Sequence, residues 1–306
     1  DATADAGEDM TACSDGGITI SGTAENYNTV IWMTEGDGTF EDFTALETIY
    51  YPGENDIAEE NVILSLTAFA FPGCNNATDY KHITLILPPT VNAGADQTIC
   101  ENQSALLQAT AENYSSVQWQ TNGSGTFNNP SILNPVYTPS ATDKTAGSVV
   151  LTLTAQPISP CVVSTSDQMT LTIQRLATAN AGSDATICED ATYTLNGTAQ
   201  RYSSISWSSS GTGTFNNPST LKPVYTPSAV DKTAGSVVLT LTAQPISPCN
   251  VSTSDQMTLT IQRLATANAG SDATICEDAT YTLNGTAQHY SSVSWSSSGT
   301  GTFNNP

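Results

Sequence analysis

Positive charge is scarce in this chain of 306 residues. It has 7 Lys plus Arg against 29 Asp plus Glu, which gives a formal net charge of -22. Nucleic acids and anionic membrane surfaces attract mainly cationic side chains, so the composition argues against both as partners. Long apolar runs are also missing. No stretch approaches about 18 consecutive apolar residues, and we expect no membrane insertion in this fragment.

Residues that carry chemistry are equally rare. The only histidines, His82 and His289, occupy unrelated positions, and the cysteines form no Cys-x-x-Cys pair that would indicate zinc. No Gly-x-Ser-x-Gly elbow is present to hold a catalytic serine. The sequence therefore predicts a protein that is not an enzyme, has no catalytic residue and needs no cofactor.

The cysteines show that the chain is repetitive. They lie alternately 61 and 26 or 27 residues apart, at positions 13, 74, 100, 161, 188, 249 and 276. The resulting period of 87 or 88 residues is too long for a solenoid unit and suits one small domain. We predict a first, divergent repeat in residues 1–88, then repeats in 89–176 and 177–264 and a partial fourth repeat in 265–306. A partial repeat leads us to expect a piece of something longer.

Aromatic residues keep the same register. A tryptophan recurs 19 residues after the first cysteine of each repeat, a phenylalanine 27 after it and, in the first three repeats, a tyrosine 37 after it. The tryptophan alternates with polar residues, which favours a core position over a platform for stacking sugars. The predicted core tryptophans are Trp32, Trp119, Trp207 and Trp295.

Apolar residues alternate with polar ones in short segments, as in strands with one buried face. In the third repeat, residues 192–195, 204–207, 237–243 and 257–261 show this period of two. Clusters of Gly, Asn and Pro separate the segments and predict turns. About seven strands per repeat, together with the Cys…Trp…Cys order, predict an all-β tandem array of immunoglobulin-like β-sandwich domains.

The constant 61-residue separation favours one disulfide inside each repeat, and therefore an oxidising, extracellular compartment. The predicted pairs are Cys13–Cys74, Cys100–Cys161 and Cys188–Cys249. A bond from one repeat to the next is the alternative, because the two cysteines of a repeat need not lie at the same end of a sandwich.

Recurring aspartates suggest one further site. Asp96, Asp184 and Asp272 lie four residues before the first cysteine of a repeat, and Asp56, Asp143 and Asp231 lie 43 residues after it. Acidic side chains near a linker could supply oxygen ligands to calcium. The other interpretation is a turn residue on an acidic surface, and no Asp-x-Asp-x-Asp run concentrates the ligands.

Three segments resemble polycystic-kidney-disease-type (PKD-like) immunoglobulin-fold repeats: Asn92-Ala-Gly-Ala-Asp-Gln-Thr-Ile-Cys100, Tyr225-Thr-Pro-Ser228 and Met257-Thr-Leu-Thr-Ile261. The form with Thr-Ile-Cys is similar to repeats of very large Bacteroidota surface proteins, including adhesins exported by type IX secretion. The Trp-x-Phe-Gly-Asp-Gly run of many PKD domains is missing. The resemblance implies a cell-surface location and a stalk that carries other domains.

We therefore expect a structural repeat region, acting as an adhesin stalk or a surface filament. Its partners would be neighbouring repeats of the same chain, with self-association into fibres through exposed sheet edges as a further prospect. The alternative is a module whose loops at domain ends bind a surface glycan or protein, multiplied along the array. In that case the loops of the divergent first repeat, at residues 35–38 and 41–43, are the predicted site.

Overall fold

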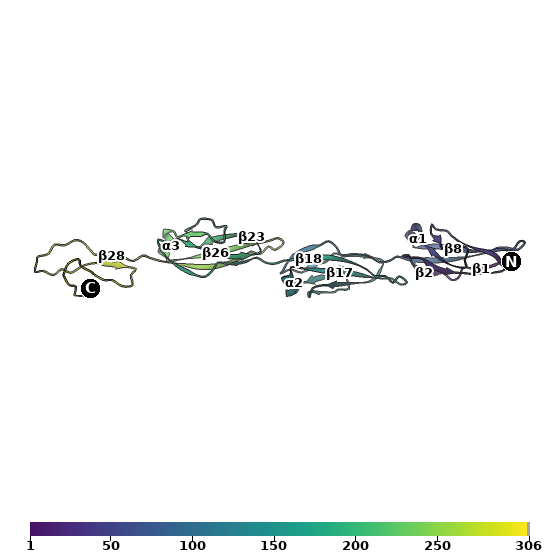
Figure 1. The fold of residues 1–306 in the computed structure, drawn as a ribbon, viewed down its shortest axis with the longest axis horizontal. Helices are drawn as coiled ribbons and strands as arrows, with labels where there is room; N and C mark the ends of the chain where they lie inside the picture. The colour runs from purple at the N-terminus through teal and green to yellow at the C-terminus, as the bar shows by residue number, and fades with distance from the viewer. Residues whose placement is uncertain (305–306) are drawn as a thin grey trace. The chain divides into compact units, whose positions relative to one another are not determined.

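The computed structural model describes residues 1–304. It divides the chain into two compact units, Asp1–Gln174 and Arg175–Pro306. The first unit holds two sets of sheets with the same design, and the second holds one such set followed by a two-stranded pair (Figure 1).

The second repeat shows the design of a set. A four-stranded sheet has the order β11-β18-β17-β14, a three-stranded sheet has the order β12-β16-β15, and β10 pairs with β13. The bounds of these strands are Thr90–Asn92 (β10), Gln97–Cys100 (β11), Ala105–Leu106 (β12), Thr110–Glu112 (β13), Tyr114–Thr121 (β14), Thr126–Phe127 (β15), Val136–Thr138 (β16), Ser148–Pro157 (β17) and Thr165–Gln174 (β18).

The first repeat uses the same sheets, in the orders β2-β9-β8-β5, β3-β7-β6 and β1-β4. Its strands are Thr3–Asp5 (β1), Met10–Cys13 (β2), Ile18–Ser21 (β3), Thr23–Glu25 (β4), Tyr27–Thr34 (β5), Thr39–Phe40 (β6), Glu47–Tyr51 (β7), Asn61–Ala70 (β8) and Ala77–Ile86 (β9).

The third repeat has the orders β20-β27-β26-β23, β21-β25-β24 and β19-β22. Its strands are Thr178–Asn180 (β19), Ala185–Cys188 (β20), Tyr193–Thr194 (β21), Thr198–Gln200 (β22), Tyr202–Ser209 (β23), Thr214–Phe215 (β24), Val224–Thr226 (β25), Ser236–Pro245 (β26) and Thr253–Gln262 (β27). In the partial fourth repeat, Thr266–Asn268 (β28) pairs with Thr286–Gln288 (β29).

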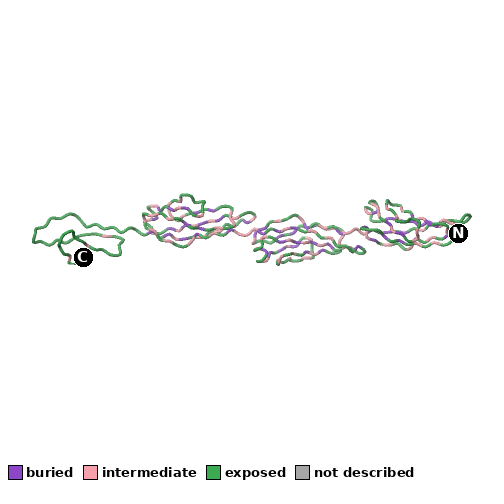
Figure 2. The backbone as a smooth tube through the Cα atoms, viewed as in Figure 1, coloured by how far each residue is buried: buried purple, intermediate pink, exposed green. Residues whose placement is uncertain are grey.

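The alternation of residue types along the strands builds the core. In β17, Val149, Leu151, Leu153 and Ala155 are buried, while the residues between them are partly exposed. Because successive side chains of a strand point to opposite faces, one face of the sheet forms core and the other meets water. Figure 2 shows the same alternation of buried and exposed residues along the long strands.

Each complete repeat has its own apolar core. The three clusters of buried residues lie within residues 2–85, 93–173 and 177–261. The four- and three-stranded sheets contribute seven strands to each repeat, and the predicted immunoglobulin-like sandwich is confirmed. The exact boundaries after residues 88, 176 and 264 stay a prediction.

Each complete repeat also contains a short helix that the sequence analysis did not predict. The helices are Glu54–Glu59 (α1), Ala141–Ala146 (α2) and Ala229–Ala234 (α3). In α2, the Ser140 hydroxyl accepts a hydrogen bond from the amide of Asp143, whose carboxylate accepts one from the amide of Ser140. This capping box and the left-handed Gly147 that ends the helix are sequence signals for a helix, in a stretch that otherwise resembles a turn.

Candidate functional site

The two cysteines of one repeat lie at opposite ends of its longest sheet. In the first repeat β2 runs parallel to β9, and Cys13 is paired in register with Ile86, the last residue of β9. Cys74 precedes Ala77, the first residue of β9. The nine residue steps from Ala77 to Ile86 span about 30 Å at roughly 3.4 Å each, whereas the Cα atoms of a disulfide are about 4.4–6.8 Å apart.

The first cysteine therefore contacts the following repeat instead of its own second cysteine. Cys13 forms a disulfide with Cys161, and the two Cα atoms are 4.9 Å apart. Cys161 lies in the turn between β17 and β18, which is the end of the second repeat that follows the linker. Its Sγ is also 3.3 Å from the carbonyl oxygen of Ile86, where β9 ends. The bond joins consecutive repeats.

This bond corrects the predicted pairing. Cys13–Cys74 and Cys100–Cys161 are both wrong, because Cys13 and Cys161 are bonded to each other. Cys188–Cys249 is wrong as well, because Cys188 is a free, exposed thiol, as are Cys74 and Cys276. The physical reason is the parallel pairing of the strands, which holds the cysteines of each repeat a strand length apart.

The sequence contains a signal that distinguishes a disulfide within a repeat from a disulfide between two repeats. The first cysteine ends a strand, while the second precedes the last strand of the repeat by only a few residues. In an immunoglobulin-like sandwich those two strands run parallel in one sheet, so that the start of one lies far from the end of the other. Equal spacing along the chain gives no information about this distance.

A buried tyrosine–aspartate pair recurs beside each helix. In the second repeat the Tyr137 hydroxyl donates to Asp143 Oδ2 at 2.8 Å, and the amides of Ser140 and Ser124 donate to the two carboxylate oxygens at 3.0 and 2.9 Å. Tyr225 and Asp231 repeat this arrangement at 2.8 Å, and the Tyr50 hydroxyl donates to Asp56. The pair holds the helix against the strand that carries the tyrosine.

The environment of this pair changes its acidity. Burial raises the pKa of the Tyr137 hydroxyl, and its hydrogen bond to the carboxylate of Asp143 also raises it. Burial alone would raise the pKa of Asp143, but hydrogen bonds from the amides of Ser124 and Ser140 and from Tyr137 outweigh it and leave the pKa lowered. The pKa of Asp231 is lowered in the same way. The carboxylate therefore acts as a fixed acceptor inside the fold.

The predicted core tryptophans are buried in the complete repeats but not fully buried in the partial one. Trp32, Trp119 and Trp207 are between 1% and 4% exposed, and the indole Nε1 of Trp119 donates to the carbonyl oxygen of Leu133 at 3.2 Å. Trp295 is only half-buried. Residues 265–304 include no counterpart of the long strands β26 and β27, which lie in the same sheet as Trp207 in the third repeat, so the Trp295 ring has less of a core to pack against.

The aspartates considered as calcium ligands make structural hydrogen bonds. Asp96 Oδ1 accepts from the amide of Thr170 at 2.7 Å, and Asp184 Oδ1 accepts from the amide of Thr258 at 2.8 Å. Each carboxylate thereby ties the start of its repeat to the last strand, while Asp272 is exposed. Within residues 1–304 no group of three or more His, Cys, Asp or Glu side chains is placed to hold a metal ion. Calcium binding stays a prediction.

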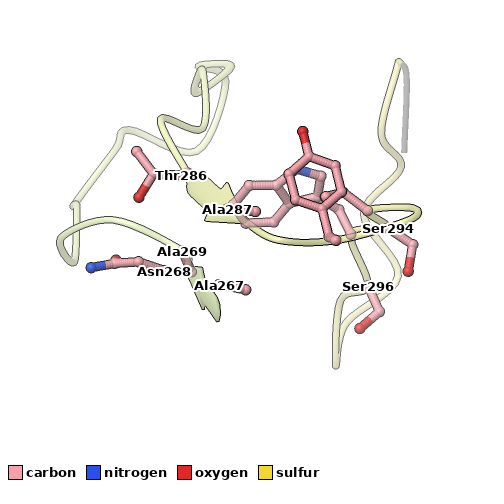
Figure 3. Close-up of a pocket in the computed structure, with 11 residues that line it drawn as sticks. Ala267, Asn268, Ala269, Thr286, Ala287, Ser294 and Ser296 are labelled. Atoms are coloured by element: carbon pink, nitrogen blue, oxygen red, sulfur yellow. The ribbon is translucent and has the colours of Figure 1, made fainter. Parts of the chain in front are cut away.

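One hollow lies in the partial fourth repeat and is lined by residues including Ala267, Asn268, Thr286 and Ser294 (Figure 3). Trp295 also lines it. The corresponding positions of the third repeat, Ala179 and Trp207, belong to or pack against a core cluster. The hollow therefore corresponds to core surface that β26 and β27 cover in the third repeat, and Figure 2 shows that nearly all of this segment is exposed.

The loops proposed as a binding site in the first repeat are partly used by the fold. The carboxylate of Asp37 accepts from the amides of Asn55 and Asp56, and Asp42 accepts from the amide and hydroxyl of Thr44. The pKa of Asp42 is lowered, first by the hydrogen bond from the Thr44 hydroxyl and then by the one from the Thr44 amide. Phe43 is exposed. Ligand binding by these loops stays a prediction.

No family model matches the chain, and no curated protein does. Solved structures that are similar to it include titin domains I67–I69, at 11% identity and a TM-score of 0.46, with 84% of this chain and 95% of that one covered. Extracellular cadherin domains 3–6 of protocadherin gamma B2 match at 13% identity and a TM-score of 0.41, over 85% and 72% of the two chains. Mouse cadherin-23 EC22–24 matches at 13% and 0.39, over 84% and 95%.

The immunoglobulin-like fold of each complete repeat follows from its own four- and three-stranded sheets. None of the helices in residues 1–304 is long and apolar enough to cross a membrane.

Proposed function

We propose that this chain is the structural repeat region of a long extracellular surface protein, acting as an adhesin stalk or a surface filament rather than as an enzyme. The observation that carries the proposal is the disulfide between Cys13 and Cys161, which joins two consecutive repeats. Disulfides persist in oxidising compartments, which supports a location outside the cytosol. Bacteroidota as the source and type IX secretion as the export route rest on the PKD-like resemblance and belong to the same proposal.

The position of the bond suits a chain that carries tension. Cys13 and Cys161 are separated by 148 residues in sequence. A force applied along the backbone passes from Cys13 through the two sulfur atoms to Cys161, so that the residues between them carry no load while the bond is intact. Unfolding of those residues cannot lengthen the chain. Such a link would keep a stalk at constant length under pulling.

Stretching single molecules of the full chain from its two ends tests this role. A fully extended chain spans about 3.3–3.6 Å per residue, so the bypass of 148 residue steps should shorten the unreduced chain by at least about 500 Å relative to the reduced one. A variant with serine at all seven cysteine positions should reach the same length with and without reductant. Equal lengths for the native chain in both conditions would contradict the proposal.

Binding of a surface glycan or protein by loops at domain ends is the alternative. The two proposals predict different effects of adding repeats. A binding module gains avidity with each added repeat, whereas a stalk gains only length. Immobilised glycans and host surface proteins can be probed with the full chain. Saturable binding that is lost on replacing residues 35–38 and 41–43 by their second-repeat counterparts would favour the alternative.

A further inference from the structure

The cysteines of all three complete repeats occupy equivalent positions. Each first cysteine is the last residue of a strand that runs parallel to the last strand of its repeat: Cys13 is in register with Ile86, Cys100 with Gln174 and Cys188 with Gln262. Each first cysteine therefore lies where the chain leaves its repeat.

The second cysteines are also equivalent. Cys161 and Cys249 both end an Ile-Ser-Pro-Cys turn between the last two strands, and the amide of each donates to the carbonyl oxygen of the isoleucine at 3.0 Å. Both are 5% exposed. Cys74 occupies the corresponding turn of the first repeat and is exposed.

The connections between repeats have the same length. The last strand of one repeat and the first strand of the next are separated by residues 87–89, 175–177 and 263–265. Chemistry that occurs at one junction can therefore recur at the next.

We infer that the disulfide between Cys13 and Cys161 recurs along the array as a ladder of disulfides, and that Cys188 is the half of such a bond. Its partner is the second cysteine of a completed fourth repeat, the counterpart of Cys249.

Each bond forms by oxidation of two thiols. The two cysteines lose two protons and two electrons to a disulfide-containing oxidant, either a protein or a small molecule, which is reduced to two thiols. No other group is consumed, and the reaction is reversed by a dithiol.

A ladder changes how an array carries load. The path through the bonds runs from Cys13 to Cys161, along the backbone to Cys188, and across the next bond. Only the 27 residue steps from Cys161 to Cys188 carry tension, out of the 175 from Cys13 to Cys188. Such bonds would make the array resist lengthening even when domains unfold.

Extending the chain by one half-repeat tests the inference. Appending a copy of residues 219–264 after Pro306 completes the fourth repeat and supplies a counterpart of Cys249. We expect non-reducing peptide mass spectrometry to find Cys188 linked to the added cysteine. Alkylation of Cys188 under native conditions should fall at least tenfold relative to the unextended chain, and should be restored when the added cysteine is replaced by serine.

Hydrogen exchange in the peptide around Trp295 reports whether the added half-repeat has folded. A slow-exchanging fourth repeat with a fully reactive Cys188 would overturn the ladder, and so would any pairing of Cys188 other than with the added cysteine. These measurements detect only sulfur pairing, so that a failed ladder would leave the stalk proposal to be decided by the pulling experiment.

Discussion

The first and second repeats differ at most positions, yet both bury an aspartate against a tyrosine beside a short helix. In the second repeat the Ser140 hydroxyl caps that helix by accepting from the amide of Asp143 at 3.1 Å. Gly53 stands in the place of Ser140 in the first repeat, and the carboxylate of Asp37 accepts from the amide of Asp56 at 3.3 Å instead. The same donors are satisfied by different side chains, which indicates that the fold requires the hydrogen bonds rather than a particular cap.

The first repeat also holds residues that suit their positions poorly. Lys81 is 6% exposed, and its ammonium donates to the carbonyl oxygen of Ala6 at 3.3 Å, where the second repeat buries Met169. Glu60 ends α1 with a φ of 56°, where Gly147 ends α2. A buried cation and a left-handed glutamate both cost free energy of folding. We therefore expect the second repeat to be the more stable of the two.

Removal of the buried carboxylate should have the largest effect and should act alike in both repeats. Asp143→Ala leaves the Tyr137 hydroxyl and the amides of Ser140 and Ser124 without their acceptor, and we expect a loss of about 3 kcal/mol in the free energy of unfolding of the second repeat. Asp56→Ala should cost the first repeat a similar amount. Hydrogen exchange resolved by repeat measures both, with the exposed Asp15→Ala as control. A loss below about 1 kcal/mol in either repeat would show that the pair is dispensable.

Swapping the buried lysine and methionine between the two repeats should reduce the difference in their stability. Met169→Lys places an ammonium in the core of the second repeat, and we expect it to destabilise that repeat by about 2 kcal/mol. Lys81→Met should stabilise the first repeat by about 1 kcal/mol because it removes a buried cation. Both changes can be read from denaturant titrations followed by repeat-resolved hydrogen exchange. If Lys81→Met left the stability of the first repeat unchanged or lowered it, this expectation would be contradicted.

Acid should weaken the second and third repeats through the same carboxylates. The pKa values of Asp143 and Asp231 are lowered in the folded protein, so their contribution to stability is fully present above the ordinary aspartate pKa of about 3.9. It is lost as the pH falls through the folded pKa values. Thermal unfolding between pH 6 and pH 2 should show this decline. Asp143→Ala should remove the acid dependence from the second repeat alone, and equal slopes in the two repeats of that variant would refute the assignment.

The helix ends offer the smallest effect. Glu60→Gly should stabilise the first repeat by about 0.5–1 kcal/mol, because glycine adopts a left-handed backbone without the steric cost of a Cβ atom. Gly147→Ala should destabilise the second repeat by about 1 kcal/mol; no atom lies within 4 Å of the added methyl group, so that only the φ of 83° opposes it. Differential scanning calorimetry of the paired variants measures both. Shifts of the same sign would disprove the explanation.

Local patterns in the sequence were sufficient for the repeat, its strands and its fold class. The alternation in residues 237–243 predicts β26, because a period of two is a property of the strand itself and needs no partner. The register of Trp119, Phe127 and Tyr137 likewise groups three rings that lie in contact, with centroids 6.1 and 4.9 Å apart. The helix at residues 141–146 could also have been predicted from the sequence, because its capping box is a local signal.

The pairing of the cysteines was decided by the tertiary structure. The 61-residue spacing is the same whether the bond lies within a repeat or between two repeats, because spacing along a chain does not determine distance across a sheet. The parallel register of β2 with β9 places Cys13 at the exit of its repeat, and the turn that holds Cys161 lies at the entrance of the next. A disulfide forms only between sulfur atoms in contact, so the path of the strands selects its partner.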